Sequence, residues 1–325
     1  MMSMLSSIAE MFGRTPGKKP DDSAYNEGAR TLHESKRGAE GKKERVAAIK
    51  AERDLHPSHK WRNRRWASIL LVNALFVVSF SWDVQLIEGS LSASRVFGFH
   101  MADLNAALQV MLAFKEILIN LVIGTATVLL LWWLLGGRTF CSWVCPYHLL
   151  SELAEYLHLR LASMKMVRDL PMHRGVRTVL YVIFAGLAFG TGYTVFEAIS
   201  PVGILSRAMI YGPGLALIWV FVLLAFEVFV SRRAWCRYMC PIGLTYGMVG
   251  ITSPVHVTYN LEKCLHEGDC RTVCLVPHVL EVTKKGFALR EDTDIGADCT
   301  RCGMCVDICP TDSLTYDVKG LNKLL

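Results

Sequence analysis

The sequence predicts an all-α membrane domain of four transmembrane helices, arranged as a duplicated two-helix unit, followed by a small α+β domain. Three observations predict this: long apolar stretches between polar ends, an internal repeat, and closely spaced cysteines near the C-terminus. Apolar stretches of about 20 residues are typical of helices that cross a bilayer. We expect three regions: a basic, partly disordered cytoplasmic arm over residues 1–65, the transmembrane domain over residues 66–253 and the small domain over residues 254–325.

The N-terminal arm is rich in Lys, Arg, Glu, Ala and Gly and has few aromatic residues. A segment of this composition cannot bury enough apolar surface to form a core. Within it, residues 1–12 place apolar side chains at helical spacing, which predicts a short amphipathic helix; chance periodicity in a disordered start is the alternative. No apolar run precedes a small-residue cleavage site, so we expect no secretory signal.

The four candidate transmembrane segments span residues 67–82, 117–135, 176–196 and 215–230. Lys and Arg are concentrated in the arm, in the loop between the second and third segments, and after the fourth segment. Because cytoplasmic loops carry an excess of these residues, both termini are predicted to be cytoplasmic, in a multi-pass protein of the bacterial inner membrane. Residues 83–114 are mildly apolar and are expected to form a re-entrant or interfacial helix.

An internal repeat follows the second and fourth apolar segments. Residues 140–146 and 235–241 both read aromatic-Cys-x-aromatic-x-Cys-Pro, at a separation of 95 residues. This repeat is the basis for the predicted duplication of a two-helix unit. Thiols spaced i, i+4 share one face of a helix, which suits a metal cluster or a dithiol pair, with ordinary packing as the third interpretation. The candidate cofactor-binding residues of the repeat are Cys141, Cys145, Cys236 and Cys240.

The cysteine run near the C-terminus has the spacing of a bacterial ferredoxin. It reads Cys299-x2-Cys302-x2-Cys305-x3-Cys309-Pro310. In that pattern three thiolates bind one [4Fe–4S] cluster and the fourth thiolate binds a second cluster. Structural zinc also uses Cys-x2-Cys pairs, but it does not account for the later cysteines and the proline. We therefore predict that the small domain is ferredoxin-like and cytoplasmic, and that it binds iron–sulfur clusters.

An altered copy of this run lies upstream, with Cys264, Cys270 and Cys274 as its cysteines. Glu267 stands where the pattern has its second cysteine, so the first cluster would receive thiolates only from Cys264, Cys270 and Cys309. The second cluster is expected to use four thiolates, which by the crossover of the pattern are those of Cys299, Cys302, Cys305 and Cys274.

The composition of the first cluster remains open at this point. A [3Fe–4S] cluster needs only the three thiolates. A [4Fe–4S] cluster needs a further ligand, from Glu267, Asp269 or His266. Loss of the cluster is the third outcome, and we expect two clusters in total.

Several other redox chemistries have no motif in this sequence. It contains no Cys-x2-Cys-His for covalent haem, no histidine pair within the apolar segments for a b-type haem, and no glycine-rich nucleotide loop. Basic residues at membrane flanks explain the net charge of +6, so this charge does not indicate nucleic-acid binding. Electrons are therefore expected to pass to or from a partner protein or a membrane quinone.

Glu227 lies within the fourth apolar segment. A carboxylate inside a membrane is costly, so it is a candidate functional residue. We expect it to act as a catalytic group that accepts a proton from quinol. Pairing with a polar group in the helix bundle and snorkelling to the interface are the alternatives.

Together these motifs resemble one known family. Residues 140–146 and 235–244, the run Ile199-Ser-Pro-Val-Gly, and the cysteine tail with residues 277–280 are similar to the NapH-type and MauN-type ferredoxin-type membrane proteins. The resemblance implies two cytoplasmic [4Fe–4S] clusters and the oxidation of menaquinol or ubiquinol. It also implies electron transfer through a periplasmic iron–sulfur or cytochrome partner to a terminal reductase, such as nitrate reductase. Glu267 departs from the family pattern, which has cysteine there.

The chain is therefore predicted to be a quinol dehydrogenase component that splits the electron pair of quinol and passes the electrons on singly. Two other functions fit the same motifs. A maturation factor would use the clusters and thiols to supply electrons or a metal to a partner enzyme. A redox sensor would use the altered cluster near Glu267 to report oxygen.

Overall fold

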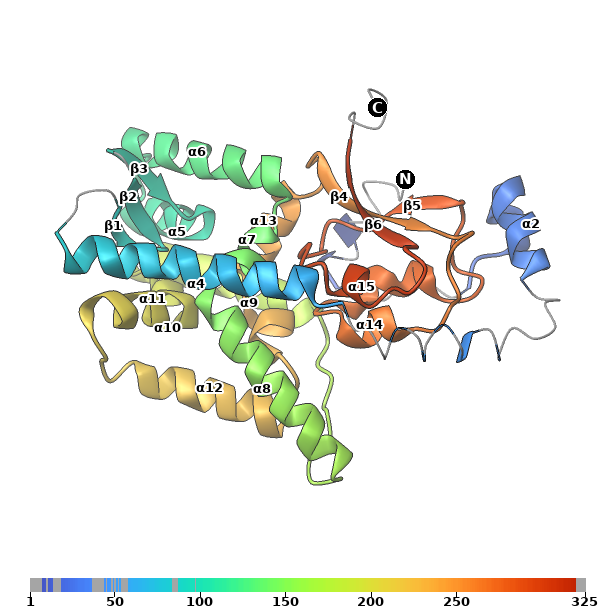
Figure 1. The fold of residues 1–325 in the computed structure, drawn as a ribbon. Helices are drawn as coiled ribbons and strands as arrows, with labels where there is room; N and C mark the ends of the chain where they lie inside the picture. Colours follow the sequence, from blue (N-terminus) through green and yellow to red (C-terminus); the bar gives the residue numbers. More distant parts are fainter. Residues whose placement is uncertain are drawn as a thin grey trace.

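The computed structural model describes residues 8–9, 11–13, 19–36, 44, 46–47, 49, 51, 53, 58–83, 87–96 and 98–319. Figure 1 shows a larger helical part and, to its right, a smaller mixed part that contains the C-terminal strands. The amphipathic helix expected over residues 1–12 lies largely outside the described residues. Of its apolar side chains, Met11 is fully buried in a small core with Leu244 and Ala297.

The helical part begins with α4 (Lys60–Ser81) and an antiparallel sheet of β1 (Ile87–Ser90), β2 (Ala93–Val96) and β3 (Phe99–Ala102). It continues with α5 (Leu104–Phe114), α6 (Ile119–Leu135), α7 (Thr139–Trp143), α8 (Pro146–Ser163), α9 (Gly175–Thr191), α10 (Val195–Ile199), α11 (Pro201–Tyr211) and α12 (Leu217–Phe229). A π turn, η2 (Trp235–Met239), and α13 (Ile242–Val249) complete it.

The prediction of four transmembrane helices in an all-α domain is wrong. Among the described residues, a single helix, α4, is long and apolar enough to cross a membrane. The other three predicted segments form α6 and α9, with 17 residues each, and α12, with 13 residues. These helices are shorter than the roughly 20 residues that a crossing needs. The multi-pass topology and the cytoplasmic location of both termini depended on four crossings, so neither is supported.

Glycine ends two of these helices early. Gly136 and Gly192 have φ values of 118° and 71° and follow α6 and α9, where their N–H groups donate to the carbonyls of Trp132 and Ala188. A positive φ at a helix end is favourable for glycine because it lacks a Cβ atom. The apolar residues beyond Gly192 form separate helices, α10 and α11. Hydropathy averaged over a stretch of sequence does not reveal these helix ends.

The described residues between 83 and 114, expected to form a re-entrant or interfacial helix, form the sheet β1–β3 and helix α5 instead. In the sheet, Ile87 of β1 lies opposite Val96 of β2. The sheet packs closely on α6 at Gly124, where a Cβ atom would lie 2.6 Å from the His100 carbonyl oxygen. The absence of a side chain at this glycine therefore allows β3 to approach the helix.

The smaller part holds the C-terminal cysteines. Its sheet has the order β5-β4-β6, with β4 (Val255–Asn260) antiparallel to both β5 (Asp292–Asp294) and β6 (Leu314–Val318). Short helical segments accompany the cysteine loops: α14 (Asp269–Val273), η3 (Pro277–Thr283) and α15 (Met304–Asp307). The arm contributes α2 (Glu27–Ser35), whose Ala29 is buried in the core of this part. On the same helix, His33 Nε2 lies 3.0 Å from the Ala288 carbonyl oxygen.

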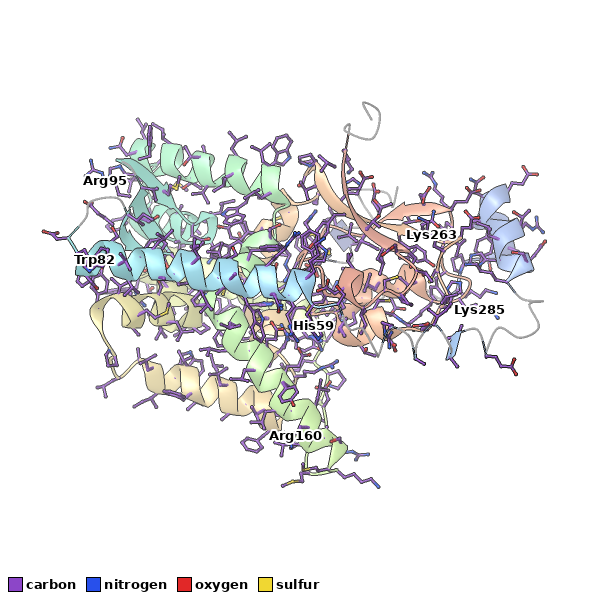
Figure 2. All side chains as sticks on the ribbon, in the orientation of Figure 1. His59, Trp82, Arg95, Arg160, Lys263 and Lys285 are labelled. Atoms are coloured by element: carbon purple, nitrogen blue, oxygen red, sulfur yellow. The ribbon has the colours of Figure 1, made fainter. Side chains whose placement is uncertain are left out.

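The outer helices of the helical part expose apolar side chains. Ile119 and Ile123 of α6 are exposed, and so are Ile218 and Phe221 of α12. Figure 2 shows side chains that project outward from α6 along the top of the view and from α12 along the bottom. Extensive exposed apolar surface marks contact with a membrane or with another protein.

Candidate iron–sulfur sites

Four buried cysteines of the smaller part line one cavity, which we call the second tail site: Cys274, Cys299, Cys302 and Cys305. The first of them follows α14, and the other three come from α15 and the loop that leads to it. Arg301 and Gly303 in this loop have positive φ values of 51° and 77°. These two left-handed residues turn the loop tightly, so that three sulfur atoms reach one cavity.

Hydrogen bonds hold Arg301 in its unusual conformation. Its buried guanidinium group donates to the carbonyls of Val255, Cys299 and Gly250. Its own carbonyl accepts from Trp143 Nε1 at 3.0 Å. Its backbone N–H donates to Cys299 Sγ, with 3.4 Å between nitrogen and sulfur. Hydrogen bonds to ligand sulfurs are one means by which a protein sets the potential of a cluster.

Burial raises the pKa of three thiols of this site. It raises the pKa of Cys274 and of Cys305, and the neighbouring thiols raise both pKa values further. Burial also raises the pKa of Cys299, against a lowering effect from Arg301. Because the thiolate is the metal ligand, a buried group of such thiols suits a cofactor that brings positive charge into the cavity.

A second cavity, the first tail site, is lined by Cys264, Cys270, Cys309 and Glu267. The backbone N–H of His266 donates to Cys264 Sγ, and that of Ser313 donates to Cys309 Sγ, both at 3.3 Å. Both tail cavities therefore present sulfur atoms that accept backbone hydrogen bonds, as the ligands of iron–sulfur clusters do.

Glu267 brings a carboxylate to the first tail site. Its side chain is 8% exposed and lies 3.6 Å from Arg53 Nη1 of the arm, which also pairs with Asp269 at 2.9 Å. Asp269 and His266 line the same cavity. The cavity thus combines three thiols with oxygen and nitrogen donors, the donor set discussed above for an altered cluster.

We expect Glu267→Cys to raise the iron content of the first tail site, because it completes a set of four thiols around one cavity. The gain expected after exposure to oxygen is about one iron atom per chain, because the unchanged chain then loses the iron bound by the carboxylate and shows the EPR signal of an oxidised [3Fe–4S] cluster. Iron analysis and EPR spectroscopy measure both effects. Glu267→Gln is the matched control, because it removes the charge without adding a thiol. Equal iron content and equal oxygen sensitivity of Glu267→Cys and the unchanged chain would contradict the prediction.

The two repeat motifs meet at a third cavity, the repeat site, which is lined by Cys141, Cys145, Cys236 and Cys240. The first pair lies in α7 and directly before α8, and the second pair lies in η2 and directly before Pro241 and α13. The structure therefore brings together four thiols from two segments that lie 95 residues apart in the sequence.

Residues inside the repeat motifs contact the second tail site. Ser142 Oγ of the first motif donates to the Thr300 carbonyl at 2.6 Å. Arg237 of the second motif donates to the carbonyls of Leu275 and Cys274, at 2.7 and 3.2 Å. Ser142 and Arg237, which occupy x positions of the two motifs, thus hold the loops that carry the second tail site. Nothing in the spacing of the motifs signals this role.

A buried ion-pair cluster joins the helical part to the smaller part. The Asp298 carboxylate lies 2.5 Å from Arg138 Nη1, 3.1 Å from Arg177 Nη2 and 2.8 Å from His278 Nε2. Burial alone would raise the pKa of Asp298, but the two guanidinium groups hold it well below its usual range. In the sequence, Arg138 looks like one of the basic residues that flank a membrane segment, so the sequence does not indicate this pairing.

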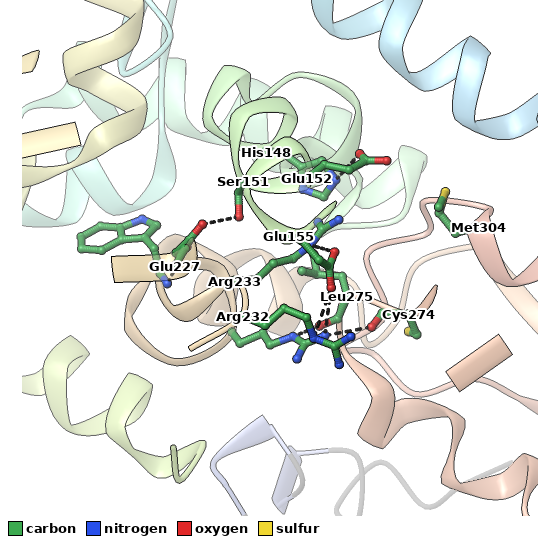
Figure 3. Close-up of polar contacts among 12 residues, drawn as sticks. His148, Ser151, Glu152, Glu155, Glu227, Arg232, Arg233, Cys274, Leu275 and Met304 are labelled. Atoms are coloured by element: carbon green, nitrogen blue, oxygen red, sulfur yellow. Dashed lines mark hydrogen bonds and ion pairs between the residues drawn. The ribbon is translucent and has the colours of Figure 1, made fainter. Parts of the chain in front are cut away.

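Glu227, the predicted catalytic residue, is 1% exposed and lies near the end of α12. Its Oε2 accepts from Ser151 Oγ at 2.6 Å, as Figure 3 shows, and its Oε1 accepts from the Trp235 N–H at 3.0 Å. The buried Tyr147 hydroxyl, in contrast, has no hydrogen-bond partner among the described residues. Because Trp235 lines the repeat site, Glu227 lies directly behind that cavity. Its catalytic role stays a prediction.

The three cavities differ from a site for a single metal ion. Within the described residues, no three His, Cys, Asp or Glu side chains are placed to hold one metal ion directly. The fit to iron–sulfur clusters rests on the thiols that converge on each cavity and on the backbone N–H groups that donate to sulfur in the tail sites.

Comparisons with known proteins agree with this donor chemistry. A family model described as a 4Fe–4S binding domain matches residues 118–165 and 212–253, which include the two repeat motifs. Another model with the same description matches residues 296–315. No solved structure matches the chain.

Two relatives cover most of the chain. The methylamine utilization ferredoxin-type protein MauN of Methylorubrum extorquens is 30% identical over 283 residues, which are 85% of this chain and 96% of the relative. The ferredoxin-type protein NapH of Escherichia coli is 31% identical over 269 residues, which are 80% of this chain and 91% of the relative. The chain belongs to the NapH/MauN family of ferredoxin-type proteins. The family resemblance inferred from the motifs is confirmed, and this NapH/MauN protein is an iron–sulfur electron-transfer protein that works with redox partners.

Proposed function

We propose that this NapH/MauN-family chain is a membrane-associated subunit that oxidises quinol and passes the electrons to a partner in a periplasmic reductase system. The observation that carries the proposal is the succession of three adjoining cysteine-lined cavities. The two tail sites adjoin at α14, which carries Cys270 of the first site and is followed directly by Cys274 of the second. Leu275, the neighbour of Cys274 in the second tail site, lines the repeat site. The cavities therefore form a series that leads from the smaller part into the helical part.

In this proposal each tail site holds one cluster, within a ferredoxin-like domain over residues 254–325. The first site uses Cys264, Cys270, Cys309 and Glu267, and the second uses Cys274, Cys299, Cys302 and Cys305. An iron–sulfur cluster supplies a carrier for single electrons when it is bound. The protein contributes burial, which excludes water from the second site, and backbone N–H groups that face the sulfur atoms.

The exposed apolar helix faces support contact with a membrane and its quinol. Besides α6 and α12, helix α4 exposes Leu70 and Leu71, and α9 exposes Val179 and Val182. An apolar surface of this kind accepts lipid or a hydrophobic quinol tail. Quinol loses two electrons and two protons when it becomes quinone, so the site needs a proton acceptor as well as an electron acceptor. The resemblance makes nitrate reductase the leading candidate for the terminal enzyme.

The proton acceptor in this proposal is Glu227. Trp235 lines the repeat site and its backbone N–H donates to Glu227 Oε1, so the carboxylate lies directly behind the wall of the cavity. We expect Glu227→Gln to slow quinol oxidation about 100-fold, the lower end of what general-base catalysis contributes, without loss of iron. The rate of quinol oxidation and the iron content are measured together.

Ser151→Ala is the matched control for this substitution. It removes the hydrogen bond to Glu227 Oε2 but keeps the carboxylate. We expect it to change the rate by much less than Glu227→Gln does. Equal rates for Glu227→Gln and the unchanged chain would show that Glu227 takes no part in proton transfer and only holds the Trp235 backbone in place.

Anaerobic rapid mixing with a menaquinol analogue tests the proposed function. The visible absorbance of the oxidised protein is followed, and dithionite defines complete reduction. We expect quinol to reduce the protein rapidly and in large part. Complete reduction by dithionite together with no reduction by any quinol would reject quinol oxidation and favour a role in maturation or oxygen sensing.

A further inference from the structure

We propose that Arg53 of the N-terminal arm is a positioning residue of the first tail site, where it holds the Glu267 carboxylate in place to bind a fourth iron atom. The inference rests on the proposed function above, which assigns a cluster to this site with Glu267 among its ligands. It adds a role for the arm, whose composition predicts no core of its own. The role can be measured without quinol.

The loop around Glu267 has the backbone geometry of the loop around Cys302. In both loops the two flanking residues have positive φ values, 57° and 93° beside Glu267 and 51° and 77° beside Cys302. In both, the backbone N–H just before this position donates to the sulfur of the first cysteine of the loop, at 3.3 and 3.4 Å. Each side chain lines the cavity of its own site. Glu267 therefore stands where the second tail site has a thiol ligand.

Arg53 contacts this carboxylate and also bridges two of the cysteine loops. Its Nη1 lies 3.6 Å from Glu267 Oε2 and 2.9 Å from Asp269 Oδ2. The same nitrogen lies 3.5 Å from the carbonyl oxygen of Ile308. Asp269 and Ile308 each directly precede a cysteine of the first tail site. One guanidinium group thus links the carboxylate to the loops that carry two of the three thiols.

The ion pair between Arg53 and Glu267 is largely shielded from water. The two side chains are 14% and 8% exposed, so their attraction is screened less than that of a surface pair. Because a carboxylate has two oxygen atoms, it can bind iron through one while the other faces Arg53. Residues that hold a metal ligand in this way matter for the metal, and their loss typically weakens metal binding about 10–100-fold.

Contacts on both sides of Arg53 hold the arm against the smaller part. Before it in the sequence, Lys36 Nζ donates to the Cys264 carbonyl at 2.7 Å. After it, where the arm joins α4, the Trp61 N–H donates to Asp307 Oδ2 at 2.9 Å. Lys36 and Arg53 together contact the loops of all three cysteines of the first tail site. The arm therefore belongs to the structure of this site.

Exposure of the full-length protein, purified without oxygen, to oxygen tests the proposal. The growth of the EPR signal of an oxidised [3Fe–4S] cluster gives the rate at which the fourth iron is lost, and iron analysis confirms the amount. We expect Arg53→Gln to lose this iron about tenfold faster than the unchanged chain does. Arg53→Lys keeps the charge but not the planar guanidinium group, so its rate is expected to lie between the other two.

The Glu267→Cys background shows whether Arg53 acts through Glu267. A fourth thiolate needs no ion pair with Arg53, so we expect Arg53→Gln to leave the iron content of this background unchanged after exposure to oxygen. If the arm only supported the general packing of the site, Arg53→Gln would cost iron in both backgrounds. That result would overturn the proposal.

Arg30→Gln is the matched control, because it removes the same charge from an exposed position of the arm, where Arg30 pairs with Glu34 at 3.7 Å. We expect its rate of iron loss to equal that of the unchanged chain. Equal rates for Arg53→Gln and the unchanged chain would overturn the proposal. Slower loss in Arg53→Gln would also overturn it, since Arg53 would then compete with iron for the carboxylate. A failure of quinol oxidation would leave these rates unaffected, because the measurement contains no quinol.

Discussion

Asp298→Asn is expected to lower the free energy of unfolding by about 3–5 kcal/mol, because it leaves two buried guanidinium groups without a counter-charge. Arg138 and Arg177 are at most 2% exposed in their side chains and lie 2.5 and 3.1 Å from Asp298 Oδ1. Asparagine keeps the shape of the side chain and one acceptor oxygen, so the substitution isolates the effect of charge. Urea unfolding of the detergent-solubilised protein, followed by tryptophan fluorescence, measures the change.

Asp292→Asn is the matched control for this prediction. Asp292 is exposed, belongs to the same part of the protein and accepts from Asn260 Nδ2 at 2.8 Å. The amide oxygen of asparagine can still accept this bond, so we expect a change of at most about 0.5 kcal/mol. If Asp298→Asn costs no more than Asp292→Asn, the ion-pair cluster does not hold the two parts of the protein together.

Cys302→Ala is expected to remove about four iron atoms per chain and to abolish electron transfer from quinol to a one-electron acceptor. Cys302 lines the second tail site. This site adjoins the first tail site through α14, which carries Cys270 and is followed by Cys274, and adjoins the repeat site through Leu275. Loss of the cluster at this site therefore interrupts the series of cavities. Iron analysis and steady-state rates with quinol measure the two effects.

Met304→Leu is the control for this substitution, because Met304 is the neighbour of Cys305 in α15 and leucine has a similar volume. Its sulfur is 3.7 Å from Arg65 Nη2 and does not line the second tail site. We expect iron content and rate to stay close to those of the unchanged chain. Full iron content in Cys302→Ala would mean that this cysteine is not a ligand.

Cysteine spacing was informative because it reflects local geometry. The run from Cys299 to Cys305 needs only a short loop with left-handed residues, and the structure has Arg301 and Gly303 in that conformation. The same spacing predicted a separate group of thiols with Glu267, and the structure places that group around its own cavity. Short sequence patterns of this kind are largely independent of the rest of the fold.

The number of transmembrane helices could not be read from apolar character in the same way. The segments are apolar, but Gly136 and Gly192 end two helices, and a three-stranded sheet occupies part of the region predicted to be all-α. Contacts between residues that lie far apart in the sequence could not be predicted from it either. Ser142 with Thr300 and Arg138 with Asp298 are pairs that only the assembled fold brings together.

EPR spectroscopy of the full-length protein, purified without oxygen, most directly tests whether the tail cavities hold clusters that carry electrons from quinol. The spectrum is recorded as isolated, after a menaquinol analogue, and after dithionite. We predict signals of two reduced clusters that interact with each other, because the two cavities adjoin, and we predict that quinol increases these signals. Folded protein with no iron–sulfur signal after dithionite would contradict the assignment of the tail sites, and signals that only dithionite produces would contradict quinol oxidation.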